Sequence, residues 1–290
     1  MLQYRHKALR RLMRGRTSAF ELKNLSYKMK HIISDEQIAN YRENGFLVIE
    51  EFLDQDELEK WRFAVDEAVL SRDEKVHPSD PNFTNQKNFK QRLQLWMDND
   101  PIKNLILDRR IGKMAADLEG VDGIRIWHDQ ALIKMPFADP TSWHQDNPKW
   151  SFTSNNAIAI WIALDDVSPH NGCMYFLSKS HKKRYKDVAT YAPMSEIFDI
   201  NHELKEKNPI AAPMRAGSCS FHNGLTVHGA AANMTQGLRR AMTCSFMPDG
   251  STFNGLTNVL PQSYVDTLKV GDLLKNDSLN PLVYSSIVQP

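Results

Sequence analysis

The stretch that decides the fold spans residues 157–164 and reads Ala-Ile-Ala-Ile-Trp-Ile-Ala-Leu. Alternate residues of a β-strand point to opposite faces of a sheet. One face of this stretch is therefore aliphatic, whereas the other carries three alanines and Trp161. The aliphatic face predicts packing in a core, and the small face leaves room for a cavity that Trp161 would enter.

A second strand, Arg239–Phe246, has the same construction. Its small face carries Arg239, Ala241, Thr243 and Ser245, and its other face is largely aliphatic. Arg240 falls on that other face, so we favour Arg239 as the residue of the cavity. The alternative is that Arg239 and Trp161 are ordinary residues of exposed faces. In the strand predicted over 124–134, the face expected to line the same cavity is Ile124, Ile126, His128, Gln130, Leu132 and Lys134.

Helices are predicted in the first part of the chain and strands in the second. Ser34 with Gln37 forms a capping box that begins a helix ending at Asn44, and Asp54 with Glu57 begins another that runs toward Leu70. Helical spacing returns over 101–118, and residues 72–90 read as a surface loop. The remaining strands are predicted at 46–49, 172–177, 218–222 and 226–230. This order indicates an α+β protein with a β-sandwich or barrel core.

Composition excludes several classes of protein. The 290 residues are 41% hydrophobic, which excludes wholesale disorder. The longest apolar run has 8 residues, whereas a membrane helix needs about 20. No apolar leader heads the chain, and three widely spaced cysteines form neither a disulfide framework nor a CxxC metal site. We therefore expect a globular protein of the cytoplasm.

Charge divides the chain into a basic arm, residues 1–33, and one domain, residues 34–290. Residues 1–30 hold nine Lys and Arg against one acidic residue, and the rest of the chain has an acidic excess of seven. Such an arm could contact a membrane surface, nucleic acid or an import receptor. We favour a solvated arm on the acidic body, with peripheral membrane contact as an alternative and no nucleic-acid partner.

A metal site is indicated by Trp143-His144-Gln145-Asp146. The His-X-Asp spacing puts an imidazole and a carboxylate on one face of a strand. A third imidazole from a distant strand would complete a facial two-histidine, one-carboxylate set, which suits Fe(II) and leaves coordination positions open. His228 follows about eighty residues later, and Arg239 lies eleven residues beyond it. An arginine there could bind the distal carboxylate of a dicarboxylic co-substrate.

Residues 143–248 resemble the phytanoyl-CoA dioxygenase family of iron(II)- and 2-oxoglutarate-dependent oxygenases. The helix-and-strand opening, residues 37–58, also resembles that family. The matching pieces are His144-Gln145-Asp146, the run 159–166, Asn171-Gly172-Cys173, Ser178-Lys179-Ser180-His181, Gly217-Ser218 and His228-Gly229 followed by Asn233 and Arg239. The resemblance implies a double-stranded β-helix, a jelly-roll barrel of the cupin type, with N-terminal helices packed outside.

The resemblance also implies roles for individual residues. His144, Asp146 and His228 would bind iron, and Arg239 would pair with 2-oxoglutarate. Trp161, Gln130 and Arg92 would contribute to the co-substrate pocket. His222 is a rival third ligand, which we place second because only His228 has the His-Gly match and the eleven-residue gap. The sequence departs from the family at two positions: Ala230 stands where a serine often contacts the co-substrate, and Lys179 replaces a turn glycine.

The implied reaction uses Fe(II), 2-oxoglutarate and O2, releases succinate and CO2, and oxidises an unactivated C–H bond of a small molecule. The carboxylate of Asp146 favours hydroxylation over halogenation, because related halogenases leave that position small. Two alternatives stay open: a catalytically silent metal-binding scaffold, and a cupin-like metalloenzyme that uses no 2-oxoglutarate. Residues 72–90 and 182–212 are expected to select the substrate. The basic run 182–186 is either a substrate contact or a solvated turn, and no signal indicates the oligomeric state.

Overall fold

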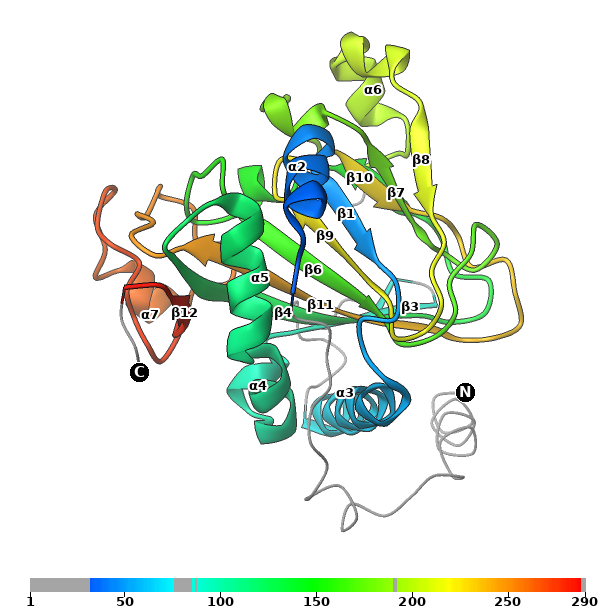
Figure 1. The fold of residues 1–290 in the computed structure, drawn as a ribbon, viewed down its shortest axis with the longest axis horizontal. Helices are drawn as coiled ribbons and strands as arrows, with labels where there is room; N and C mark the ends of the chain where they lie inside the picture. The colour runs from blue at the N-terminus through cyan, green and yellow to red at the C-terminus, as the bar shows by residue number, and fades with distance from the viewer. Residues whose placement is uncertain (1–31, 76–84, 87, 190–191, 288–290) are drawn as a thin grey trace.

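The computed structural model describes residues 32–75, 85–86, 88–189 and 192–287, which form two antiparallel sheets with helices outside them (Figure 1). The predicted basic arm lies outside these ranges except for its last two residues. Helices and antiparallel strands together confirm the α+β class. In the described residues, no helix is both long and apolar enough to cross a membrane.

The large sheet has eight strands. Its order is β1 (Phe46–Ile49), β9 (Cys219–Asn223), β6 (Ile158–Ala163), β11 (Arg239–Pro248), β4 (Gly123–Lys134), β3 (Phe89–Leu93) and β2 (Asn85–Gln86), and β12 (Leu282–Ser285) also pairs with β4. The small sheet runs β5 (Thr141–His144), β10 (His228–Ala230), β7 (Met174–Leu177) and β8 (Pro209–Ala212). One buried cluster joins Trp161 and Ala241 of the large sheet to Phe176 and Ala230 of the small one, so the two sheets pack face to face.

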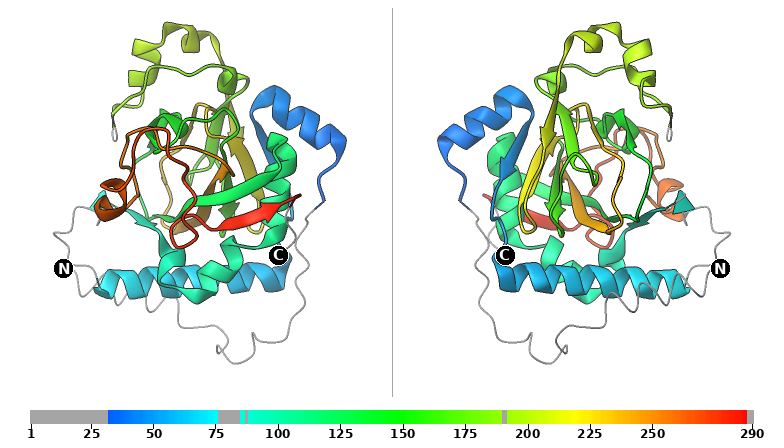
Figure 2. Two further views of the ribbon diagram at one scale, coloured as in Figure 1. Left: turned by 90° about the vertical axis from the view of Figure 1, so that its left-hand side faces the viewer. Right: turned by 90° about the vertical axis from the view of Figure 1, so that its right-hand side faces the viewer.

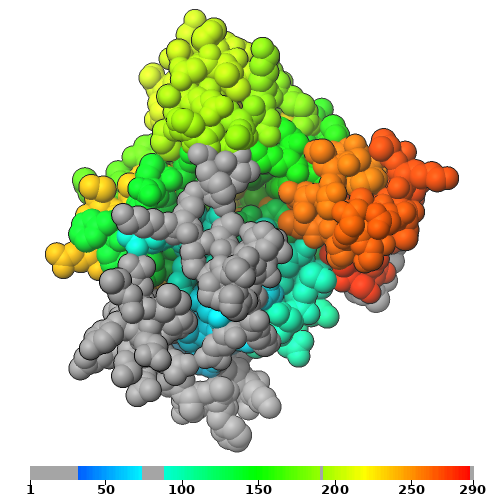
Figure 3. Space-filling model, turned by 180° about the vertical axis from the view of Figure 1, so that it is seen from behind, coloured from blue at the N-terminus to red at the C-terminus, as the bar shows by residue number. Residues whose placement is uncertain are grey.

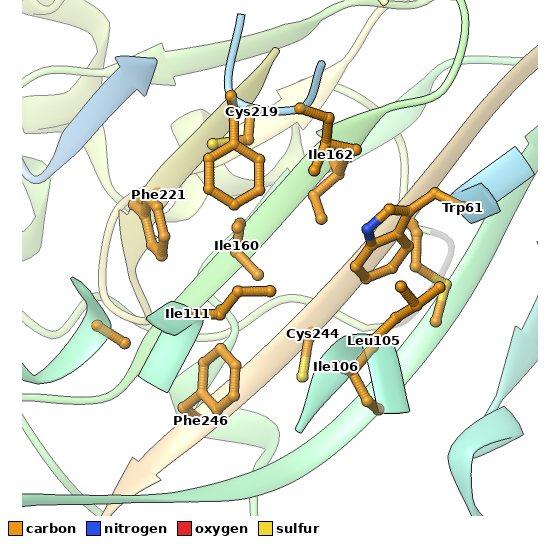
Figure 4. Close-up of a cluster of buried hydrophobic side chains, with 14 of the residues drawn as sticks. Trp61, Leu105, Ile106, Ile111, Ile160, Ile162, Cys219, Phe221, Cys244 and Phe246 are labelled. Atoms are coloured by element: carbon orange, nitrogen blue, oxygen red, sulfur yellow. The ribbon is translucent and has the colours of Figure 1, made fainter. Parts of the chain in front are cut away.

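Three helices cover the other face of the large sheet (Figures 1 and 2). They are α3 (Gln55–Lys75), α4 (Asp100–Ile106) and α5 (Arg109–Glu119). Figure 4 shows the core between these layers, where Trp61, Ile106 and Ile111 of the helices meet Ile160 and Phe246 of the sheet. The aliphatic faces predicted for β6 and β11 therefore form the helix-side core.

The first helix, α2 (Asp35–Asn44), begins and ends as its sequence predicts. Ser34 accepts a hydrogen bond from the backbone N–H of Gln37, the Gln37 side chain accepts one from the Ser34 N–H, and both halves of the capping box are formed. Gly45 ends the helix with φ 85°, a conformation that favours glycine. The prediction of a second helix from Asp54 is also confirmed, since Asp54 accepts from the backbone of Glu57.

The helical spacing predicted over 101–118 is confirmed, and the structure divides this stretch into two helices, α4 and α5. Asp108 lies between them and accepts a hydrogen bond from the backbone N–H of Arg110 at 2.8 Å. An aspartate that caps a helix adopts a non-helical backbone conformation, so it begins a new helix instead of continuing the old one.

The prediction of a surface loop over 72–90 is wrong at both ends of that range. Helix α3 continues to Lys75, and β2 and β3 occupy 85–86 and 89–93. The polar composition of β3 concealed a strand that pairs with β4. Residues 182–212 hold a short helix, α6 (Glu196–Ile200), and strand β8. In Figure 3 the segment around α6 (yellow-green) and the segment that follows β11 (orange) project as separate lobes.

The prediction that one uninterrupted face of 124–134 lines the cavity is wrong, because β4 contains a bulge. The register against β11 shifts at Trp127. An extra residue in one strand reverses the face that the following side chains occupy. Ile124 and Ile126 therefore pack in the helix-side core, whereas Gln130 and Leu132 line the cavity between the sheets.

Candidate active site

Strand pairing brings the predicted metal ligands together. His144 ends β5, His228 begins β10, and the two residues are direct partners in the register of the small sheet. Their rings lie 4.3 Å apart between centroids. Asp146 follows two residues after His144, and one ligand atom from each of the three residues lies within 4.8 Å of the others. The spacing predicted from the sequence thus forms a compact His-Asp-His group.

Backbone carbonyls orient both imidazoles of this group. Nδ1 of His144 lies 2.7 Å from the Ser142 carbonyl oxygen, and Nδ1 of His228 lies 2.8 Å from that of Thr226. A carbonyl only accepts hydrogen bonds, so each Nδ1 carries the proton and each Nε2 keeps its lone pair. The free nitrogens face Asp146, at 3.3 Å from Oδ1 for His144 and 3.8 Å from Oδ2 for His228. This donor set fits a metal such as Fe(II).

Two members of this group, His228 and Asp146, have shifted pKa values that favour their metal-binding protonation states. Burial lowers the pKa of His228 to about 3, so this imidazole is neutral near pH 7. Burial alone would raise the pKa of Asp146, but the histidines around its oxygens hold that pKa well below the usual value. A neutral imidazole and an ionised carboxylate are the forms that bind metal.

Arg239 supplies a buried positive charge at the other end of the cavity. Its side chain is 1% exposed, and its Nη1 donates a hydrogen bond to the Leu132 carbonyl at 3.3 Å. Nε has no hydrogen-bond partner, and no ion pair with an acidic group is found for Arg239 among the described residues. Burial lowers its pKa to about 10. A desolvated guanidinium without a carboxylate fits the anionic end of 2-oxoglutarate.

A cavity of about 120 Å³ connects the His-Asp-His group to Arg239. Trp161 and Gln130, both predicted here, line it, and the Arg239 guanidinium lies 5.5 Å from the Trp161 ring centroid. Ala230 lines it without a hydroxyl, as its sequence implies, whereas Thr141, Thr243 and Ser245 bring hydroxyls from other strands. Phe89, Gln91 and Met174 also line the cavity and were not singled out in the sequence, because alternation in their short strands is weak.

Arg92 does not reach the cavity. It forms an ion pair with Asp73, at 2.6 Å between Nε and Oδ1, and its side chain is buried. Gln91, its neighbour on β3, lines the cavity instead. Adjacent residues of a strand point to opposite faces, so the sequence prediction falls one residue from the pocket.

A second cavity, of about 130 Å³, adjoins the first and shares Phe89, Gln91, Thr141 and His144 with it. The rest of its lining comes from Pro140, Ser142, Trp143, Lys149, Val188 and Ala189. Two lysines of the predicted basic run, Lys182 and Lys183, form surface ion pairs with Glu43 and Glu203 and do not line either cavity.

Other singled-out residues have structural contacts. Lys134 is fully buried and its ammonium donates to the carbonyls of Asp139 and Ala231. His181 contacts the Arg42 carbonyl through Nε2 at 3.1 Å. Lys179 has φ 62°, so it keeps the left-handed conformation of the glycine it replaces.

Comparison with known proteins places this site in a family. The family model described as phytanoyl-CoA dioxygenase (PhyH) matches residues 41–241. The peroxisomal phytanoyl-CoA dioxygenase of Mus musculus is 24% identical over 249 residues, which cover 79% of this chain and 73% of the relative.

Two solved structures extend the comparison. The alpha-ketoglutarate-dependent carbocyclase SnoK from nogalamycin biosynthesis is 26% identical, with a TM-score of 0.73 over 89% of this chain and 99% of its own. The epimerase SnoN, in complex with Fe3+, alpha-ketoglutarate and nogalamycin RO, is 25% identical, with a TM-score of 0.68 over 86% and 98%. With the His-Asp-His group, these findings confirm the predicted cofactors, Fe(II) and 2-oxoglutarate.

Proposed function

The chain belongs to the phytanoyl-CoA dioxygenase family, and from this premise we propose that it hydroxylates an unactivated C–H bond of a small molecule. Iron bound with 2-oxoglutarate and O2 supplies the oxidising power, and succinate and CO2 are released. In this proposal the two facing sheets belong to a double-stranded β-helix, and residues 34–290 act as one catalytic domain; the face-to-face packing of the two antiparallel sheets supports it.

His144, Asp146 and His228 hold the metal in this proposal. Both imidazoles direct an unprotonated Nε2 at the carboxylate, and each is fixed through Nδ1 by a backbone carbonyl. Such second contacts fix ring orientation and strengthen the ligand. Three protein ligands on one side of the ion leave positions for a co-substrate.

Arg239 carries the assignment of 2-oxoglutarate. A buried guanidinium without a carboxylate partner is costly, and its retention is explained by a ligand that brings the missing negative charge. A bidentate ion pair would fix the distal carboxylate and thereby orient the other end of the co-substrate toward the metal ligands. Trp161 and Gln130 line the space between, and exclude water from it.

Hydroxylation is proposed because Asp146 occupies the third ligand position. A small residue there would leave a coordination position for a halide, whereas the carboxylate fills it. The silent-scaffold alternative is disfavoured because all three ligands and the arginine are present in one cavity.

The second cavity is proposed as the place of the substrate. It meets the first at His144, Thr141 and Gln91, so a molecule bound there lies beside the metal ligands without displacing the co-substrate from Arg239. Its lining includes the aromatic side chains of Phe89 and Trp143 and one cation, Lys149. The cavity volume of about 130 Å³ fits a small molecule, or one end of a larger one.

Succinate formation tests the proposal. The protein, reconstituted with Fe(II), is supplied with 2-oxoglutarate and O2, and succinate and O2 consumption are measured without and with candidate small molecules. We expect a slow basal release of succinate that a substrate accelerates, and none from the Asp146→Ala variant. O2 consumption without succinate would favour the metalloenzyme that uses no 2-oxoglutarate, and neither signal would favour the scaffold.

A further inference from the structure

A third imidazole, that of His222, borders the carboxylate of Asp146. Its Nε2 lies 3.5 Å from Asp146 Oδ2, and its side chain is 3% exposed. The residue lies on β9, in the large sheet, whereas the other two histidines belong to the small sheet. His222 lines the same cavity, with its ring 4.5 Å from that of His228 between centroids.

Hydrogen bonding distinguishes His222 from the two proposed ligands. His144 and His228 each place Nδ1 against a carbonyl, which leaves Nε2 unprotonated. Nδ1 of His222 is buried and has no hydrogen-bond partner among the described residues. A proton there would be a buried donor without an acceptor, whereas Nε2 faces a carboxylate, which only accepts hydrogen bonds. The proton of a neutral His222 therefore sits on Nε2, which is a donor toward Asp146 and not a lone pair for a metal.

The position of His222 agrees with this role. The metal-binding group whose atoms lie within 4.8 Å of one another contains His144, Asp146 and His228 but not His222. A carboxylate that binds a metal through one oxygen has a second oxygen that needs a donor. His222 approaches Asp146 from the side of Oδ2.

The turn after His222 holds the backbone of the same aspartate. The Gly224 carbonyl accepts hydrogen bonds from the N–H groups of Asp146, at 3.0 Å, and Asn147, at 2.9 Å. One segment of the chain, β9 and its turn, thus contacts both the main chain and the side chain of the metal-binding aspartate. Strand β9 lies between β1 and β6 in the sheet, so this segment is rigidly held.

We infer that His222 is a positioning residue, which donates its Nε2–H to the Asp146 oxygen that iron leaves free. It would thereby fix the orientation of the carboxylate that, with His144 and His228, would hold the metal. This inference rests on the proposed function, and it assigns to the rival histidine of the sequence a role other than that of ligand.

Anaerobic Fe(II) titration of the apoprotein tests the inference, with dissociation constants measured for four proteins. His222→Leu removes the donor, whereas His222→Gln can return an amide N–H to a similar distance from the backbone. His128→Leu is the matched control: His128 is a buried histidine of strand β4 whose Nδ1 also lacks a partner among the described residues, and it forms no hydrogen bond or ion pair with Asp146, which acts on it only through its charge. The visible absorption of the Fe(II)–2-oxoglutarate complex is recorded for each protein.

We expect His222→Leu to weaken Fe(II) binding roughly 10–100-fold, as loss of a contact to a metal ligand does, and to shift the absorption of the complex. His222→Gln should restore most of the affinity, and His128→Leu should match the unaltered protein. If His222→Leu fails to fold by circular dichroism, His222→Asn, whose amide is too short to reach Asp146, should show the same loss.

Unaltered affinity in His222→Leu, or an equal loss in His222→Gln, would overturn the positioning role. Complete loss of binding, equal to that of His228→Ala, would overturn it in favour of a fourth ligand. If the unaltered protein does not bind Fe(II), the proposed function and this inference are both overturned. If it binds Fe(II) tightly and His222→Leu has the same affinity, only the inference is overturned.

Discussion

Arg239 and Arg240 are neighbours on β11, yet they belong to opposite faces of the large sheet and have opposite environments. Arg240 points to the helix layer, where its guanidinium binds Asp165 through two nitrogens, at 2.7 and 2.9 Å, and Asp66 at 2.7 Å. Arg239 points between the sheets, where no acidic group of the described residues pairs with it.

The difference separates a residue that stabilises the fold from one that serves a ligand. The half-buried Arg240 has its charge balanced by two carboxylates, whereas the fully buried Arg239 has no carboxylate partner among the described residues. The same contrast runs along β6, where Ile160 packs in the helix-side core and Trp161 lines the cavity. Substitutions on the helix-side face should therefore change the free energy of unfolding, and substitutions on the cavity face should change ligand binding.

The largest effect is expected from Arg240→Ala. The substitution removes the half-buried guanidinium that Asp66 and Asp165 share, and loss of the charge-assisted hydrogen bonds to the two carboxylates costs about 3–4 kcal/mol in all. Urea unfolding should show this loss of unfolding free energy. The affinity of the remaining folded protein for 2-oxoglutarate should stay within about twofold, a difference of roughly 0.4 kcal/mol, and a large loss of affinity would break the comparison between the faces.

Ile160→Ala should cost somewhat less, about 3 kcal/mol of unfolding free energy, because it opens a cavity in the helix-side core. Ile160→Val is the graded control, with an expected cost of about 1 kcal/mol. Fe(II) binding by both folded variants should equal that of the unaltered protein. A change in metal affinity without a change in stability would show that the core face reaches the site.

Arg239→Leu should have the reverse effect. Loss of a charge-assisted contact to a carboxylate corresponds to about 2 kcal/mol, which is roughly a 30-fold weaker affinity for 2-oxoglutarate. The unfolding free energy should be equal to or higher than that of the unaltered protein, since an unpaired buried charge is removed. Anaerobic calorimetry with Fe(II) present measures the first quantity, and urea unfolding the second. A fall in stability with unaltered affinity would contradict the assignment of Arg239.

The smallest effect is a pH dependence of the unfolding free energy that comes from Glu119, at the end of helix α5. Burial raises the pKa of Glu119 from 4.5 to about 7, although Tyr41, Asn223 and Asn156 donate to its carboxylate. The folded state thus favours the protonated acid, and this contribution is complete below pH 4.5 and lost as the pH rises through about 7. Between pH 6 and 8, the unaltered protein should lose about 1–2 kcal/mol more unfolding free energy than Glu119→Gln does. If the unfolding free energies of the two proteins, measured in urea, change equally with pH, this prediction is refuted.

Alternation of side chains made much of the site predictable. Strands β6 and β11 pair with each other in regular register. Side-chain alternation along each strand therefore predicts the faces on which Trp161 and Arg239 lie. The capping box at Ser34 was equally local. His144 and His228 needed the resemblance to a family, because their pairing depends on two strands far apart in the sequence.

The predictions that were wrong depend on features that periodicity does not contain. The bulge at Trp127 is set by pairing with β11, so it reversed the faces of Ile124 and Ile126 without a signal in their own sequence. Strand β3 is polar because it lies near the edge of the sheet, so its sequence did not indicate a strand. The predicted cavity residue was Arg92, whereas its neighbour Gln91 lines the cavity. The division of 101–118 into two helices at Asp108 is likewise not visible in the apolar spacing, which predicted only that the stretch is helical.

The most direct test of the account is the visible charge-transfer absorption that forms when 2-oxoglutarate chelates protein-bound Fe(II) without oxygen. The unaltered protein should develop the band on titration with both components. His228→Ala should show none, and Arg239→Leu should need a higher co-substrate concentration to reach it. Tight metal binding without a band in the unaltered protein would contradict the claim that the cavity between His228 and Arg239 holds 2-oxoglutarate.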